Sequence, residues 1–189
     1  YARAATFAQT NTLLYAWLTR ERRVDWTNAS FMGLFDYRSM DWSADLADAL
    51  AFDRNLLAPI HAPHSVAPLT RRSADALGLR AGTPVALGGL DGAMSSLGVG
   101  AIQPGDAYDV SGTSEMIAVC LPEPVASPEL LARWHVAPGL WTLIGAISTA
   151  GAALQWFRDR IYQPGSADDP QALYDAMTAE AAASPIGAN

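Results

Sequence analysis

The chain has 189 residues, and 50% of them are hydrophobic, so it can bury the core of one ordinary domain or of parts of two. Its net charge of −7 and its pI of about 4.7 argue against a broad electrostatic surface for nucleic acid, although backbone amides can still bind a phosphate-bearing small ligand locally. A single cysteine, no apolar run near the ~18 residues that span a bilayer and no leader-like start predict a soluble, cytoplasmic chain without a membrane partner.

Local patterns in the first half predict helices separated by polar or proline-rich passages. Apolar spacing predicts helices over residues 6–18, 40–52 and 70–78. Ser43 and Thr70 are suited to cap the second and third of these helices, and Gly78 is suited to end the third. Residues 19–30 are expected to form a polar connection, and prolines favour an extended passage over residues 54–69.

The second half alternates strand and helix patterns. Strands are expected over residues 84–87, twice within residues 103–120, and over residues 140–148. Helices are expected over residues 92–102 and 150–162 and from residue 170 onward. No repeat of fixed period is visible. This mixture predicts an α/β fold.

Two short segments carry residues suited to chemistry. The segment "GGLDGAMSSLG" over residues 88–98 places one carboxylate, Asp91, among glycines and small side chains. From the residues alone, Asp91 either caps the following helix or stands beside a ligand. The segment "SGTSE" over residues 111–115 is either an ordinary hairpin turn or a loop that contacts phosphate.

The order of the segments over residues 14–162 resembles the FGGY family of carbohydrate kinases. Residues 18–50 are similar to the family pattern LTG–D–S–AS–LFD–W–LL, and residues 77–115 are similar to GL–GTPV–GG–D–LG–G–PG–GTS. The ordered series is more specific than any one of these motifs. The resemblance implies lobes of the sugar-kinase/actin/heat-shock-protein ATPase superfamily, with a ribonuclease H-like fold, that close around ATP and a sugar or polyol.

The resemblance also implies roles for residues of the two segments. Asp91 stands where the family has its general base, at the carboxyl end of a strand facing a cleft. Gly92 stands at a substrate-contacting position, where many relatives carry a polar side chain, so the side-chain contact made there is expected to be lost. Gly112, Thr113 and Ser114 match the loop that contacts the phosphates of ATP. ATP and Mg²⁺ are therefore the implied cofactors.

Several parts of the family pattern are missing from the chain. The opening D-x-G-T-T/S segment and the later Gly-Gly passage for adenosine have no match. The chain is therefore expected to be a central portion of a kinase, with an incomplete active site: residues 1–103 end the first lobe, and residues 104–189 begin the second.

The remaining polar residues are assigned no chemical role from the sequence. His61 and His64 lack a nearby cysteine or acidic cluster, so no metal site is expected. Asp25 and Asn28 are suited to turns and are treated as structural, and His135 is expected at the surface or in packing.

The expected function is ATP-dependent phosphorylation of a sugar or polyol hydroxyl. A pentulose such as xylulose is the first expectation, while gluconate, glycerol and erythritol stay open. The alternatives are a non-catalytic sugar- or nucleotide-binding module and a scaffold domain in which Asp91 only caps a helix. The expected partners are the small molecules and no nucleic acid, and a homodimer is one option for assembly.

Overall fold

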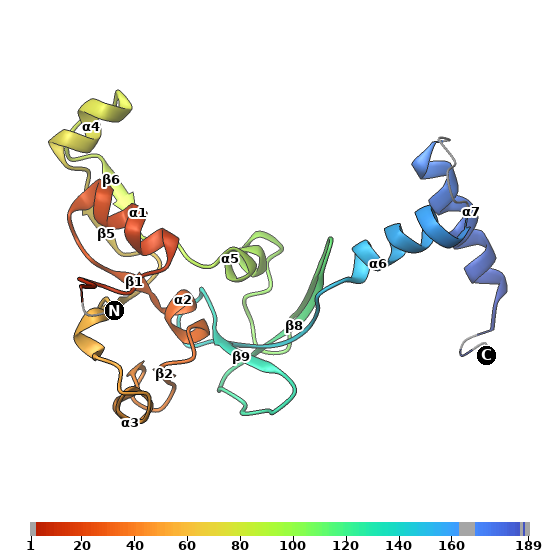
Figure 1. Ribbon diagram of the computed structural model, residues 1–189, viewed down its shortest axis with the longest axis horizontal. Helices are drawn as coiled ribbons and strands as arrows, with labels where there is room; N and C mark the ends of the chain where they lie inside the picture. The colour runs from red at the N-terminus through yellow and green to blue at the C-terminus, as the bar shows by residue number, and fades with distance from the viewer. Residues whose placement is uncertain (1–2, 163–168, 186, 188–189) are drawn as a thin grey trace. The chain divides into compact units, whose positions relative to one another are not determined.

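The computed structural model describes residues 3–162, 169–185 and 187 of the chain (Figure 1). The chain divides into two compact units. The first unit consists of Tyr1–Tyr108 and Ile117–Gly145, and the second of Asp109–Met116 and Ala146–Asn189. Within the described ranges, no helix has both the length and the apolar character needed to cross a membrane.

The first unit contains short helices joined by short strands. Its helices are α1 (Thr10–Thr19), α2 (Trp26–Phe31), α3 (Ala44–Ala49), α4 (Arg71–Leu77) and α5 (Asp91–Gly98), with a 3-10 turn η1 (Arg54–Leu56). Its first strands are β1 (Val24–Asp25), β2 (Phe35–Asp36), β3 (Asp41–Trp42), β4 (Ile60–His61), β5 (Val66–Pro68) and β6 (Pro84–Ala86). Strands β1 and β4 pair in parallel, whereas β2 pairs with β3, and β5 with β6, in antiparallel fashion. One apolar core cluster is formed by Val24, Ala29, Trp42, Leu57 and Ala58.

The predicted helix boundaries are confirmed where a local cap sets them. The Ser43 hydroxyl accepts a hydrogen bond from the Leu46 N–H at 3.2 Å, at the start of α3. The Thr70 hydroxyl accepts one from the Ser73 N–H at 3.3 Å, at the start of α4. Gly78 ends α4 with a φ of 69°, a conformation that costs glycine little.

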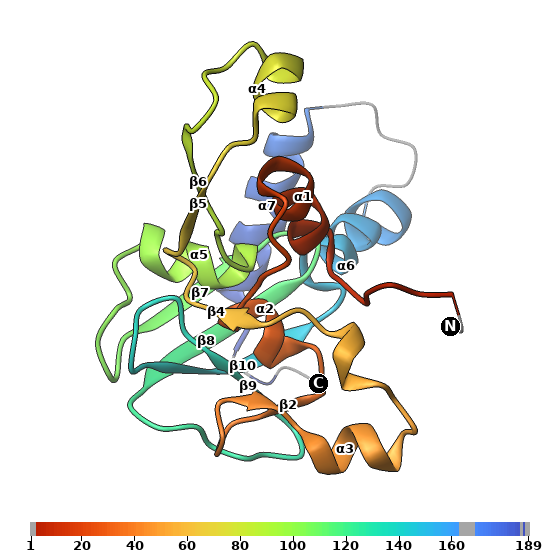
Figure 2. The same ribbon diagram turned by 90° about the vertical axis from the view of Figure 1, so that its left-hand side faces the viewer.

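A four-stranded sheet contains the longest strands of the chain. Its members are β7 (Ala107–Ser111), β8 (Glu115–Leu121), β9 (Leu131–Trp134) and β10 (Trp141–Ile147), in the spatial order β7-β8-β10-β9 (Figure 2). Strands β9 and β10 are antiparallel, with Trp134 opposite Trp141. Helix α2 packs against β9 through Trp26, whose ring stacks on Trp134 at 4.6 Å between centroids. Three aromatic rings are thus stacked in series, because Trp134 also stacks on Trp141.

The second unit contains the turn between β7 and β8 and the C-terminal helices. These are α6 (Ala150–Phe157), the π-helical turn η2 (Arg158–Tyr162) and α7 (Pro170–Ala183). The Arg158 guanidinium lies over the ring of Tyr174, 4.8 Å from its centroid, and the Tyr162 hydroxyl donates to Glu180 at 2.6 Å. The helix predicted from residue 170 onward is confirmed as far as Ala183. The helix predicted over residues 150–162 leaves α-helical geometry at Arg158.

The structure corrects one expectation from the sequence, adds one strand and decides one alternative. Residues 19–30 do not form a simple polar connection, because β1 and most of α2 lie within them. Strand β9 was not predicted; it is held by pairing with β10 and by contact with α2, neither of which is local in sequence. Of the two positions expected for His135, at the surface or in packing, the structure confirms packing: the residue is fully buried, and its ring hydrogen-bonds with Ser96 at 2.7 Å and with the Ala101 carbonyl at 3.1 Å.

Candidate active site

Asp91 is the first residue of α5 and is exposed. Its Oδ1 accepts a hydrogen bond from the Gly92 N–H at 2.7 Å, and its Oδ2 has no donor among the described residues. Strand β6 ends at Ala86, so Asp91 does not stand directly at a strand end as expected. The N-cap position belongs to Leu90, which has no capping side chain. Asp91 is therefore not the side-chain cap of α5 that the scaffold-domain alternative requires, although its negative charge suits the first turn of a helix.

A buried carboxylate network fixes the backbone just before Asp91. Asp25 is fully buried, and its Oδ1 accepts from the backbone N–H and the hydroxyl of Thr27. Its Oδ2 accepts from the side-chain amides of Asn28 at 2.6 Å and Asn11 at 2.9 Å. The Thr27 hydroxyl oxygen in turn accepts from the Leu90 N–H at 2.8 Å. This buried polar network connects α1, α2 and the start of α5. The sequence alone indicated only that Asp25 and Asn28 are suited to turns.

Asp91 borders an open hollow of about 420 Å³ in the first unit. The hollow is lined by Ala8, Gln9, Thr10, Asn11, Asn28, Gly89, Leu90 and Asp91. Asn11 has a buried Oδ1 without a hydrogen-bond partner among the described residues. Amide side chains both donate and accept, which suits the hydroxyls of a sugar or polyol. Sequence reasoning missed Gln9 and Asn11 because nothing local joins the start of α1 to Asp91.

Gly92 is partly exposed and belongs to the first unit. The Tyr108 hydroxyl donates to that carbonyl at 3.2 Å. Burial raises the pKa of the Tyr108 hydroxyl, which keeps it protonated as a donor at neutral pH. Gly92 thus offers backbone groups beside Asp91, and no side chain to contact a substrate.

The "SGTSE" segment forms the turn between β7 and β8 in the second unit. The Gly112 N–H donates to the Ser114 carbonyl at 2.8 Å and is therefore occupied. The N–H groups of Thr113 and Ser114 have no acceptor among the described residues, and both residues are exposed. These two amides, rather than that of Gly112, are available to a phosphate oxygen.

The start of α6 holds the same turn from the other side. The N–H groups of Gly151 and Ala152 donate to the carbonyls of Gly112 and Thr113, each at 3.1 Å. A Cβ on Gly151 would lie only 2.2 Å from the Gly112 carbonyl oxygen, so this helix can approach the turn only without a side chain there. At Gly112 a Cβ would meet only the Ser114 carbonyl oxygen, at an ordinary 3.8 Å. The folded chain thus needs glycine at 151 but not at 112.

The described ranges contain no group of three or more His, Cys, Asp or Glu side chains placed to hold a metal ion. Mg²⁺ is ordinarily held by one or two carboxylates together with phosphates and water, so its binding does not require a group of this size.

Comparison with known proteins confirms the resemblance seen in the sequence. Residues 1–98 match the model of the "FGGY family of carbohydrate kinases, N-terminal domain". The autoinducer-2 kinase of Yersinia enterocolitica is 32% identical over 162 residues, which are 84% of this chain and 31% of the relative. The chain spans about a third of the length of the curated relatives it matches.

Solved structures agree with the predicted fold class. The xylulose kinase from Rhodospirillum rubrum matches with a TM-score of 0.85 and 30% identity, over 97% of this chain and 37% of that one. A ligand-bound xylulose kinase from Lactobacillus acidophilus matches with a TM-score of 0.85 and 23% identity, over 94% of this chain and 36% of that one. The second likeness concerns the fold alone.

Proposed function

Because the chain belongs to the FGGY family of carbohydrate kinases, we propose that it supplies the general base and one phosphate-binding turn of an ATP-dependent sugar or polyol kinase. The observation that carries the proposal is the position of Asp91, whose carboxylate borders a hollow walled by amide side chains. A carboxylate beside a bound hydroxyl can orient it and take its proton. The family's enzymes provide the class of reaction, and the hollow provides the site.

In the proposed reaction, the substrate hydroxyl gives its proton to Asp91 while its oxygen bonds to the γ-phosphorus of ATP. The bond between that phosphorus and the bridging oxygen of ADP breaks, so the products are a phosphorylated sugar or polyol and ADP. Oδ2 of Asp91 is the oxygen open to this proton, because Oδ1 is engaged by the Gly92 N–H. Gln9 and Asn11 orient the other hydroxyls of the substrate.

The proposed phosphate contacts lie at the turn between β7 and β8. The amides of Thr113 and Ser114 donate to phosphate oxygens, and the Thr113 hydroxyl adds a third donor. The folded chain does not itself require glycine at position 112. The proposed reason for Gly112 is that the lack of a side chain lets the phosphates approach the backbone. ATP brings Mg²⁺, which neutralises charge on the phosphates when bound.

We assign residues 1–103 to the end of the first family lobe and residues 104–189 to the start of the second. The assignment is supported by the end of the N-terminal family match at residue 98 and by the Pro104-Gly105 turn signal that follows it. A homodimeric assembly and a cytoplasmic location remain predictions from the sequence.

The substrate we propose first is a pentulose such as xylulose. Support comes from the Rhodospirillum rubrum xylulose kinase, whose structure matches nearly the whole chain. The curated relatives favour a second candidate, because several of them are autoinducer-2 kinases at 32% or 33% identity. Gluconate and glycerol kinases also share the fold, so all four substrates belong in the test.

The test is ATP turnover by the full-length protein that carries this chain. ADP release is measured with xylulose, autoinducer-2, gluconate and glycerol in turn, and with no acceptor as the blank. We expect turnover that depends on one of these acceptors. If ATP or an acceptor binds by calorimetry but no acceptor supports turnover, the non-catalytic binding module becomes the better account.

A further inference from the structure

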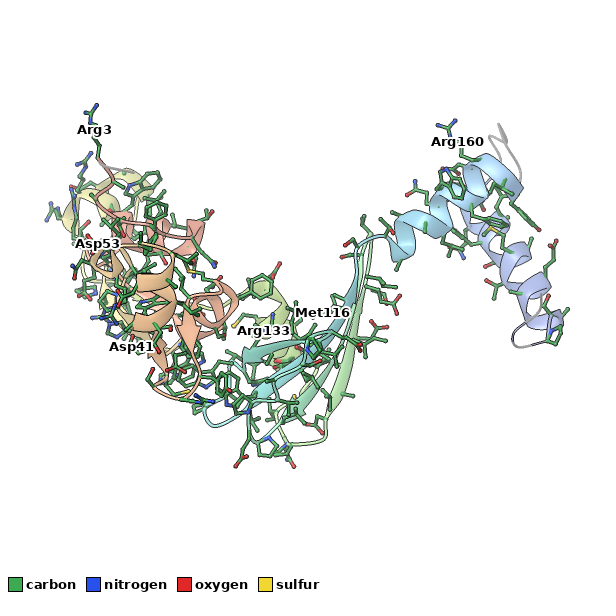
Figure 3. The ribbon with its side chains drawn as sticks, turned by 60° about the horizontal axis from the view of Figure 1, so that its bottom comes forward. Arg3, Asp41, Asp53, Met116, Arg133 and Arg160 are labelled. Carbon is green, nitrogen blue, oxygen red and sulfur yellow. The ribbon has the colours of Figure 1, made fainter. Side chains whose placement is uncertain are left out.

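Arg133 is a buried cation with no carboxylate within salt-bridge distance among the described residues. It lies on β9 and is only 2% exposed, whereas Arg3 and Arg160 extend into solvent (Figure 3). Its Nε is buried without a hydrogen-bond partner, and its Nη2 donates to the Tyr108 hydroxyl at 3.4 Å. A guanidinium stays charged in proteins, and burial without a counter-charge is costly, so this arrangement calls for an explanation.

Tyr108 joins this cation to the first turn of α5. Arginine can only donate and a carbonyl can only accept, so the direction of both hydrogen bonds is fixed. Arg133 donates to the Tyr108 oxygen, and the Tyr108 hydroxyl donates to the Gly92 carbonyl at 3.2 Å. A donor that is itself hydrogen-bonded to a cation is polarised and becomes a stronger donor. The cation therefore acts on the backbone next to Asp91 through one intervening side chain.

The first turn of α5 depends on contacts of this kind. Its N-cap, Leu90, has no capping side chain, and its second residue is a glycine, which is a poor helix former. The backbone on the two sides of Asp91 is held by two side chains from elsewhere in the first unit: Thr27 at the Leu90 N–H, and Tyr108 at the Gly92 carbonyl. The positive charge of Arg133 also attracts the negative charge of Asp91, which favours the same position of the first turn of α5.

We propose that Tyr108 and Arg133 are positioning residues that hold the first turn of α5, and with it the carboxylate of Asp91, in line with the substrate hydroxyl. This inference rests on the function proposed above for Asp91. Neither residue touches the hollow, so both act through the backbone of Gly92. Because a displacement of about 1 Å can reduce turnover by about 10²-fold, a weakened hold on this turn should lower kcat more than substrate binding.

The test removes one hydroxyl at a time from the full-length protein. Tyr108→Phe deletes the link to Gly92, and Tyr15→Phe is the matched control, because the Tyr15 hydroxyl is buried without a hydrogen-bond partner. We expect Tyr108→Phe to lower kcat by about 10-fold to 100-fold, with KM for both substrates changed by less than about twofold. Tyr15→Phe should leave kcat and KM unchanged. Arg133→Met should lower kcat in the same direction, and adding it to Tyr108→Phe should cost little more, since both act on one contact.

A second arm separates positioning from general stability. In an Asp91→Asn background the base is already absent, so Tyr108→Phe should no longer change kcat. An equal loss in both backgrounds, or a lower melting temperature with normal kcat, would show a purely structural role and overturn the inference. If Asp91→Asn itself has normal turnover, the proposed base is wrong. If Asp91→Asn is inactive while Tyr108→Phe is normal, only the positioning role is wrong.

Discussion

At the scale of single residues, the proposed role of Asp91 depends on its charge and not on its hydrogen bonds. Asp91→Asn keeps an oxygen that can accept from the Gly92 N–H, and α5 has its N-cap at Leu90. We therefore expect unfolding stability to change by less than about 0.5 kcal/mol and kcat to fall by about 10²–10⁴-fold, because the basicity is lost. Steady-state turnover and thermal melting of the full-length variant measure the two effects.

Asp75→Asn is a suitable control for this change. Asp75 pairs with Arg71 on the surface of α4, where an exposed ion pair contributes little, so both turnover and melting should stay near those of the unchanged protein. Turnover by Asp91→Asn that matches this control would contradict the proposed role of Asp91 as the general base.

A second prediction at this scale concerns Arg20, which ends α1 with a φ of 68°. The family pattern has glycine at this position, and a residue with a Cβ is disfavoured there by roughly 1 kcal/mol. Arg20→Gly should therefore raise the free energy of unfolding by about 0.5–1 kcal/mol, after the greater freedom of glycine in the unfolded chain is subtracted. Arg20→Ala removes the same side chain but keeps the Cβ, so it should give no such gain in chemical denaturation. Equal effects of the two variants would place the strain elsewhere.

At the scale of elements, the contact between α6 and the β7–β8 turn predicts that alanine lowers the melting temperature at one glycine and leaves it unchanged at another. In a helix, Gly→Ala ordinarily stabilises, but at Gly151 the new Cβ would collide with the Gly112 carbonyl oxygen. Overpacking of about 1–3 kcal/mol should displace the turn, lower the melting temperature and raise KM for ATP about tenfold or more. Gly112→Ala should leave melting nearly unchanged, because the fold has room for the Cβ.

Because the fold of the Gly112→Ala variant should be unchanged, its kinetics report only the effect of the new side chain on ligand binding. A rise in KM for ATP with unchanged melting supports a phosphate contact at this turn. Normal ATP kinetics for both Gly112→Ala and Gly151→Ala would show that the turn has no part in nucleotide binding.

The same scale shows how far the sequence could predict the fold. The starts of α3 and α4 and the end of α4 were predictable because Ser43, Thr70 and Gly78 act on residues within one helical turn. Strand β9 was not, because its four residues are held by β10 and α2. Asp25 has the local pattern of a turn residue, but one of its partners, Asn11, lies fourteen positions away on another helix.

At the scale of the whole chain, the candidate site shows the same limit. Asp91 and the "SGTSE" turn could be picked out because each sits in a short segment with a recognisable order of glycines and polar residues. Gln9 and Asn11 could not, because only folding brings the start of α1 to Asp91. Tyr108 and Arg133 resemble ordinary strand residues, and their hydrogen bonds become visible only when β7, β9 and α5 are in place.

The stability of the whole molecule should depend on pH through its buried and half-buried titrating groups. Burial lowers the pKa of His135 and of His61 below the ordinary 6.5. The unfolded chain therefore binds these protons first as the pH falls, so the corresponding stability is complete above 6.5 and is lost as the pH falls through the lower folded-state values. Burial raises the pKa of Cys120 above 9.0, and that of Tyr108 above 10.0, so stability should also fall as the pH rises through the higher folded-state values.

His135 should dominate the acid side of this profile. Its ring is fully buried, and its Nδ1 accepts from the Ala137 N–H, so protonation must break that bond as well as place a charge in the interior. His135→Gln should lower the melting temperature near neutral pH but reduce its further fall between about pH 7.5 and about pH 5.5. His64→Gln, at an exposed position, is the control and should keep the full fall. A His135→Gln protein that loses as much melting temperature on acidification as the unchanged protein would assign the acid sensitivity to other groups.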